Sequence, residues 1–259
     1  MSFKNTLLYN AHFIANSILP LQTVSKFQEN GTITAEEFVR AGDLLILKCP
    51  NWSWSYTRDI KEYSYLPSNK QFLIIKSVPC SKRINDSSEL YIKNIDDLCI
   101  LVKDSLNIDA LNIDALNIDS FEEPDLLNND ANDVINHAND EISIVKTRTY
   151  DITITYDNYY RCARLWLYGF SEYGNTLTSS QIFEDIDNEF VNTTTSYELH
   201  PHFNFYWASI HPCRHAQTML KMSTGTSVDK YLFIFLKFMQ TVIPNIEYDF
   251  TDYVINHAN

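Results

Sequence analysis

Apolar residues recur at helical spacing along the first 18 residues of the chain. They lie three or four positions apart, while lysine and asparagine occupy other faces of the same helix. This pattern predicts an amphipathic helix that ends near Pro20. Two interpretations stay open: the helix packs on a globular domain, or it lies in a membrane interface. The apolar positions are Phe3, Leu7, Ala11, Ile14 and Ile18.

The following segments predict the first elements of a folded core. Thr34 and Glu37 have the spacing of a capping box, and Gly42 is suited to end a helix. A short helix is therefore expected over residues 35–41. Residues 71–78 are rich in β-branched and aromatic side chains, which is typical of a strand.

The C-terminal half of the chain predicts a sheet followed by helices. Residues 150–156 alternate between apolar and polar side chains, and residues 164–168 form a second apolar run after an Asp-Asn turn. The two runs predict an antiparallel hairpin. The order of the elements favours an α+β domain in which helices follow the sheet. Further expected elements are a helix capped at Thr178 or Ser179 and running through Ile186, a strand over 193–197, and helices over 214–222 and 228–242.

The negative charge of the chain is concentrated in one segment. Residues 86–141 contain 15 acidic and 2 basic residues, which accounts for the whole net charge of −13. Leu-Asn-Ile-Asp recurs there every five residues, a period that suits neither a helix nor a strand. We therefore expect residues 86–145 to form a disordered acidic insertion, either a docking site for partners or a spacer. The rest of the chain is neutral, which gives no support for a nucleic-acid partner.

The composition narrows the class of protein. Hydrophobic residues make up 45% of the chain, enough for a substantial core. The five cysteines show no Cys-x-x-Cys spacing, so we expect no disulfide framework, metal site or cofactor, and the reducing cytosol is favoured. No apolar run reaches the roughly 18 residues that cross a membrane, and residues 231–243 are expected to form a buried helix. A signal peptide is not expected, because polar residues interrupt the N-terminal apolar positions.

Cys213 is the strongest candidate for chemistry. It lies just before a predicted helix, where the positive end of the helix dipole favours the thiolate. His211, Arg214 and His215 can add local positive charge, and Pro212 restricts the backbone. Two alternatives stay open: a buried structural cysteine beside two solvated histidines, or the nucleophile of a cysteine hydrolase. The hydrolase is disfavoured because no base and oxyanion hole occur at a diagnostic spacing.

Five separated motifs resemble the autophagy-related protein 3 family, the E2-like conjugating enzymes of autophagy. The resemblance covers nearly the whole chain except the acidic insertion, and the motifs occur in the order typical of the family. The motifs are residues 25–38 with 41–43, 66–73 with 78–80, 155–160 with 164–167, 200–202 with 210–215, and 235–250.

The resemblance implies a modified ubiquitin-conjugating fold and a thioester mechanism. Cys213 would accept a ubiquitin-like modifier of the autophagy-related protein 8 family from an E1-like enzyme and pass it to phosphatidylethanolamine. Thr194 matches a threonine that lies near the cysteine in the family, with Thr193 and Thr195 as substitutes, and His211 and Pro212 belong to the cysteine motif. A ligase complex for the modifier and membranes rich in phosphatidylethanolamine are further implied partners. His200 and His202 are expected to have only a structural role in a loop.

The resemblance also implies a division of the chain and a location. The protein would be cytoplasmic and transiently peripheral on membranes, where it supports autophagosome or related membrane biogenesis. A non-catalytic adaptor that gathers partners through its acidic loop is the alternative. The expected parts are an N-terminal helix over 1–20, a first part of the core over 21–85, the insertion over 86–145, a catalytic part of the core over 146–253 and a tail over 254–259.

Overall fold

The computed structural model describes residues 19–57, 63–84, 147–191, 193–223 and 225–246, and of Arg214 only the backbone. The predicted N-terminal amphipathic helix, the acidic insertion and the tail lie outside these residues. The predictions made for them, including the membrane-binding positions Phe3, Leu7, Ala11, Ile14 and Ile18, therefore stay predictions.

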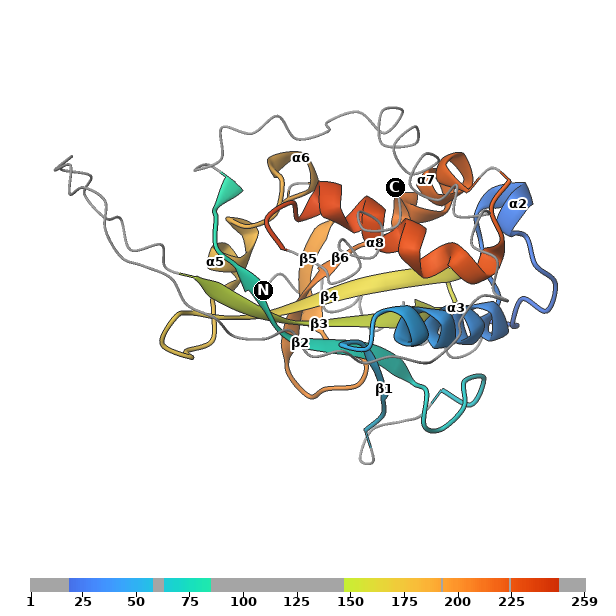
Figure 1. Ribbon diagram of the computed structural model, residues 1–259, viewed down its shortest axis with the longest axis horizontal. Coiled ribbons are helices and arrows are strands. Elements are labelled where there is room, and N and C mark those ends of the chain that lie inside the picture. The colour runs from blue at the N-terminus through green and yellow to red at the C-terminus, as the bar shows by residue number, and fades with distance from the viewer. Residues whose placement is uncertain (1–18, 58–62, 85–146, 192, 224, 247–259) are drawn as a thin grey trace, which may run out of the picture.

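A six-stranded antiparallel sheet forms the centre of the domain (Figure 1). Its strand order is β1-β2-β3-β4-β6-β5, so the last two strands are added to the edge of β4 in reversed sequence order. The hairpin predicted from the alternating residues is confirmed as β3–β4, in which Asp157 is opposite Cys162. The strands are β1 (Ser53–Ser55), β2 (Phe72–Cys80), β3 (Arg148–Asp157), β4 (Cys162–Phe170), β5 (Thr195–Leu199) and β6 (Tyr206–Ile210).

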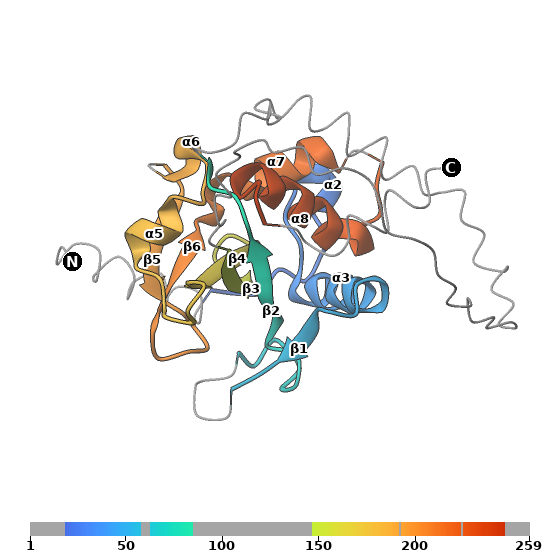
Figure 2. The same ribbon diagram turned by 60° about the vertical axis from the view of Figure 1, so that its left-hand side comes forward.

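Helices cover one face of this sheet, as Figures 1 and 2 show. The apolar side chains between the sheet and the helices form the buried core. α8 (Tyr231–Val242) is buried along most of its length, which confirms the helix predicted over this apolar run. None of the described helices is long and apolar enough to cross a membrane. The other described helices are α2 (Phe27–Asn30), α3 (Ala35–Lys48), α5 (Ser179–Phe183), α6 (Asn188–Val191), α7 (His215–Met222) and the short 3-10 turns η4 (Pro212–Arg214) and η5 (Val228–Lys230).

The helix predicted over residues 35–41 is longer than expected. The capping box of Thr34 and Glu37 is present, but α3 continues through Gly42 to Lys48. Gly42 therefore does not end the helix. A Cβ atom at this position would lie 2.2 Å from Cζ2 of Trp54, so the glycine allows the indole to pack directly on the helix backbone.

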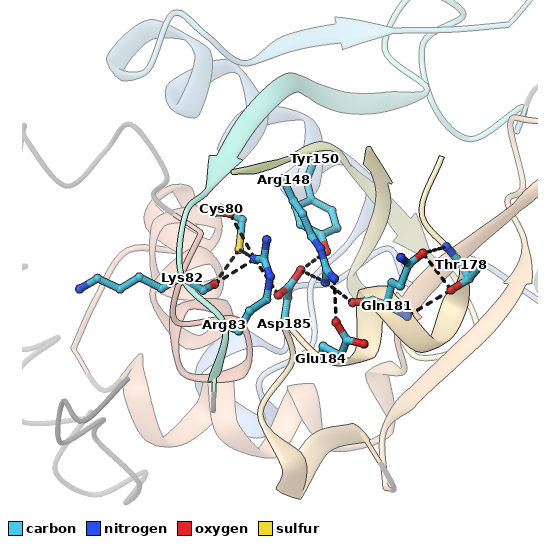
Figure 3. Close-up of polar contacts among 9 residues, drawn as sticks. All are labelled: Cys80, Lys82, Arg83, Arg148, Tyr150, Thr178, Gln181, Glu184 and Asp185. Atoms are coloured by element: carbon cyan, nitrogen blue, oxygen red, sulfur yellow. Dashed lines mark hydrogen bonds and ion pairs between the residues drawn. The ribbon is translucent and has the colours of Figure 1, made fainter. Parts of the chain in front are cut away.

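The helix predicted through Ile186 is shorter than expected. Thr178 caps α5 through a reciprocal hydrogen bond pattern with Gln181, but α5 ends at Phe183. The chain then turns and places Asp185, whose side chain is 1% exposed, inside the domain. There Asp185 accepts hydrogen bonds from Tyr150, Arg83 and Arg148 (Figure 3).

The carboxylate of Asp185 joins the two ends of the core that flank residues 85–146. Arg83 lies two residues before this segment and Arg148 two residues after it, and one nitrogen of each guanidinium is 3.0 Å from an oxygen of Asp185. Removing one partner from a buried ion pair costs about 3–5 kcal/mol, because it leaves an uncompensated charge. Asp185 therefore connects the residues that follow β2 to the start of β3.

Candidate active site

Cys213 is exposed at the start of the helical C-terminal region. It lies in the 3-10 turn η4, which leads directly into α7. The three other described cysteines are buried, and Cys213 is the exposed one among them. The alternative of a buried structural cysteine at this position is therefore wrong. The buried cysteines are Cys49, Cys80 and Cys162.

The sheet fixes the turn that carries Cys213. Strand β6 ends at Ile210, which is paired with Leu165 of β4 and with Thr195 of β5. The next residue, His211, donates its backbone N–H to the carbonyl oxygen of Thr194 at 2.6 Å. Pro212 begins η4, a position at which its missing N–H costs no hydrogen bond. The cysteine is thus presented within three residues of a fully paired strand.

The imidazole of His211 caps this turn. Its Nδ1 accepts the backbone N–H of Cys213 at 3.2 Å, and its Nε2 lies 3.4 Å from the hydroxyl of Tyr160. The sequence pattern assigns no role to Tyr160, although this residue lies in one of the motifs that resemble the family. The folded hairpin places Tyr160 in the β3–β4 turn, where its hydroxyl reaches the cysteine segment.

His215 does not provide the positive charge that the sequence suggested. It is buried, its Nδ1 lies 3.2 Å from the carbonyl oxygen of Ala163, and its ring packs against Phe235 and Phe238. Burial lowers the pKa of His215 to about 3, so the ring is neutral at physiological pH. The prediction of a cationic or solvated histidine at this position is therefore wrong.

The three candidate threonines lie beside the cysteine turn in different environments. Thr194 is buried, and its carbonyl oxygen binds His211, while its hydroxyl donates to the carbonyl oxygen of Phe190 at 3.4 Å. The hydroxyl of Thr195 donates to the same oxygen at 3.1 Å. Thr193 is exposed and donates to the carbonyl oxygen of Glu189. The structure thus brings Thr194, rather than the exposed Thr193, into direct contact with the segment that carries Cys213.

Arg164 supports the strands behind this segment. The side chain is buried, donates to the hydroxyl of Ser209 at 2.7 Å and lies 2.9 Å from the carboxylate of Glu198. Its guanidinium also lies over the ring of Trp166, with 4.4 Å to the centroid. Burial alone would raise the pKa of Glu198, but the charge and hydrogen bond of Arg164, together with smaller contributions from Ser196 and His211, outweigh this effect, so the pKa lies below its usual value. One cation therefore links β4, β5 and β6 at the base of the site.

His200 and His202 are structural, as the sequence analysis expected. Both are buried among aromatic rings, and the ring of His202 stacks on Phe72 with 4.8 Å between centroids. His200 lies 2.8 Å from the hydroxyl of Thr153. Burial lowers the pKa of His200 well below its usual value and that of His202 to about 4. Among the described residues no cluster of histidine, cysteine, aspartate or glutamate could hold a metal ion.

The buried histidines predict how stability depends on pH. Their pKa values are lower in the folded than in the unfolded chain, so unfolding takes up protons between the two values. The free energy of unfolding should be highest above about pH 6.5, the usual pKa of histidine, and should fall as the pH decreases towards 4. Urea unfolding at pH 7 and pH 5 measures this difference, and equal stability at both values would contradict the neutral state of these rings.

Comparison with known proteins identifies the family of the chain. Residues 37–250 match the family described as "Autophagocytosis associated protein, active-site domain". The autophagy-related protein 3 of Arabidopsis thaliana is 37% identical, over 89% of this chain and 90% of the relative. The proteins of the same name from Dictyostelium discoideum and Schizosaccharomyces pombe are 35% and 34% identical, over 90% of this chain and 93% and 94% of the relatives.

These matches agree with the geometry of the site and with the fold. The matched region contains the sheet, the buried helix α8 and the exposed cysteine turn. The resemblance and the α+β fold expected from the sequence are thereby confirmed. The chain belongs to the autophagy-related protein 3 family, whose members are E2-like conjugating enzymes of autophagy.

Proposed function

We propose that the chain accepts a ubiquitin-like modifier as a thioester on Cys213 and transfers it to the amine of phosphatidylethanolamine. The observation that carries this proposal is the exposure of Cys213 on a turn held by His211 and Thr194, within the part of the chain that matches the family. The modifier would belong to the autophagy-related protein 8 family and would come from an E1-like enzyme. A ligase complex for the modifier is a further proposed partner.

The reaction consists of two acyl transfers. In the first, the thiolate of Cys213 attacks the carbonyl carbon of the modifier thioester on the E1-like enzyme, a new C–S bond forms, and the donor sulfur leaves as a thiolate. In the second, the lipid amine attacks the thioester carbonyl as its free base and the C–N bond forms. The C–S bond breaks, Cys213 leaves as a thiolate, and the extra proton on the attacking nitrogen passes to water. Because the acyl group is already activated, alignment and stabilisation of the oxyanion supply most of the catalysis.

The exposed cysteine also provides the direct test of the proposal. A Cys213→Ser variant should trap the modifier as a stable oxyester, because the serine ester is a much poorer acyl donor than a thioester. The experiment incubates the variant with the modifier, the E1-like enzyme and ATP, and follows the adduct on a denaturing gel under reducing conditions. Cys213→Ala is the control and should form no adduct.

The same variants separate the proposal from its alternatives. A non-catalytic adaptor would keep its cellular function after Cys213→Ala. A cysteine hydrolase would cleave modifier from lipid without any activating enzyme. Absence of a Cys213-dependent adduct in the presence of the activating enzyme would refute the transferase.

Thr194 is the residue we propose for stabilising the developing oxyanion. Its backbone already contacts the cysteine turn, and its hydroxyl, which donates to Phe190 at a long 3.4 Å, can exchange this partner for the oxyanion. Removing one oxyanion donor typically lowers kcat by about 10²–10³. Thr194→Val should therefore slow single-turnover transfer from the Cys213 thioester to vesicles by about that factor. Thr193→Val, at an exposed position, is the matched control, and an equal loss in both variants would exclude a specific role for Thr194.

We propose that the N-terminal helix is the membrane contact. The protein would then be cytoplasmic and would bind membranes only transiently. Support comes from the first described residue, Leu19, whose carbonyl oxygen accepts a hydrogen bond from Asn158 at 3.0 Å. Asn158 lies in the β3–β4 turn, two residues before Tyr160. Leu19, which follows the segment proposed to form this helix, is therefore held near the turn that contacts the Cys213 segment.

A flotation experiment tests this contact. Replacing Leu7 and Ile14 together by Asp removes two apolar positions, each worth about 1.5–3 kcal/mol when buried. The double variant should no longer float with small vesicles that contain phosphatidylethanolamine, whereas Asn10→Asp should float like the wild type. Unchanged flotation of the double variant would assign the helix to packing on the domain instead.

A further inference from the structure

Both nitrogens of the His211 imidazole are engaged, and the two partners come from different parts of the fold. Nδ1 accepts the backbone N–H of Cys213 at 3.2 Å. Nε2 faces the hydroxyl of Tyr160 at 3.4 Å, and the two rings meet edge to face with 5.1 Å between centroids. One imidazole thus connects the β3–β4 turn to the backbone of the reactive cysteine.

The hydrogen bond at Nδ1 determines the tautomer of His211. A nitrogen that accepts an N–H uses its lone pair, so the proton of the neutral ring lies on Nε2. The Nε2–H group then donates to the oxygen of Tyr160. Burial first, and then electrostatic interactions with neighbouring groups, chiefly Tyr159 and Asp157, raise the pKa of Tyr160 to about 12, so its hydroxyl stays neutral and its oxygen can accept.

The opposite tautomer would be incompatible with this turn. A proton on Nδ1 would face the N–H of Cys213, so that two donors would oppose each other and the cap would be lost. The lone pair of Nε2 would then be the only acceptor of the ring. The hydroxyl of Tyr160 can accept or donate, but only with the proton on Nε2 do the contacts of the ring with Tyr160 and with the Cys213 backbone form together.

The turn that carries Tyr160 is itself fixed by hydrogen bonds of its backbone. The backbone N–H groups of Tyr159 and Tyr160 both donate to Oδ1 of Asp157, at 3.0 and 3.1 Å. Asp157 is buried, and its second oxygen lies 3.9 Å from the guanidinium of Arg164. The turn that carries Tyr160 is therefore anchored to the same cation that links the strands behind the site.

We propose that Tyr160 is a positioning residue of the conjugation reaction, which acts by holding His211 in the tautomer that caps the Cys213 backbone. This inference rests on the proposed function. It assigns no proton transfer to His211, because the lone pair that a base would need is engaged by the N–H of Cys213. Tyr160 acts on both acyl transfers. The sulfur of Cys213 has to point at the acyl carbon both when it attacks and when it leaves.

The sharpest test compares two neighbouring tyrosines. Tyr160→Phe removes only the hydroxyl and keeps the ring that packs on His211, whereas Tyr159→Phe makes the same change at an exposed position. A neutral hydrogen bond contributes about 0.5–1.5 kcal/mol, which corresponds to about a twofold to thirteenfold change in rate. Tyr160→Phe should slow discharge of the Cys213 thioester to phosphatidylethanolamine vesicles by that factor, and Tyr159→Phe should leave the rate unchanged.

A double-mutant cycle shows whether the effect passes through His211. In His211→Asn the side-chain oxygen can cap the turn without any tautomer, as asparagine does at helix starts. In this background Tyr160→Phe should change the rate less than about twofold, because the imidazole through which Tyr160 acts is gone and the two changes are then not additive. An undiminished effect of Tyr160→Phe in this background would overturn the proposal.

A spectroscopic measurement gives a result that does not depend on activity. The imidazole nitrogen NMR spectrum of His211 should show a proton on Nε2 in the wild type and in Tyr159→Phe, and an increased share of the Nδ1–H form in Tyr160→Phe. An unchanged tautomer in Tyr160→Phe, or equal slowing by both tyrosine variants, would overturn the inference. Failure of the wild type to form a Cys213 adduct would instead refute the proposed function, and the NMR comparison would still decide the role of Tyr160.

Discussion

The hydrogen bond from the backbone of His211 to the carbonyl of Thr194 is the contact on which the site depends. At 2.6 Å it extends the pairing of β6 with β5 by one residue, up to the proline before Cys213. A reactive thiol on a free loop would sample many directions, and its alignment with an acyl group would carry an entropic cost. Here the cysteine follows a strand that is paired on both sides, so the sheet sets its position before any partner binds.

Two buried charges hold the sheet that carries this turn. Arg164 connects β4, β5 and β6 behind the cysteine, and Asp185 receives Arg83 and Arg148 at the two ends of the core that flank residues 85–146. Such groups are costly to bury, and their hydrogen bonds offset that cost only when every partner is present. The core is therefore organised around fixed polar connections as well as around the apolar side chains of α3 and α8.

Local sequence rules predicted those features that depend on neighbouring residues. The capping box at Thr34, the β3–β4 hairpin and the buried α8 follow from spacing and periodicity, whereas the exposure of Cys213 was left open until the structure settled it. Gly42 was mistaken for a helix end because its partner, Trp54, is distant in the sequence. His215 was expected to be charged because adjacency to Cys213 says nothing about burial. Tyr160 and Asp185 could not be assigned, since their roles arise only when strand register and tertiary packing bring several segments together.

The proposed function requires that Cys213 carry the modifier as a thioester. Intact-mass spectrometry of the wild-type chain, after incubation with the modifier, the E1-like enzyme and ATP, detects this adduct. We expect a mass increase of one modifier less one water, located on Cys213 by peptide mapping and removed completely by a thiol reductant. A modifier that survives the reductant, or one attached at any other residue, would refute the thioester on Cys213.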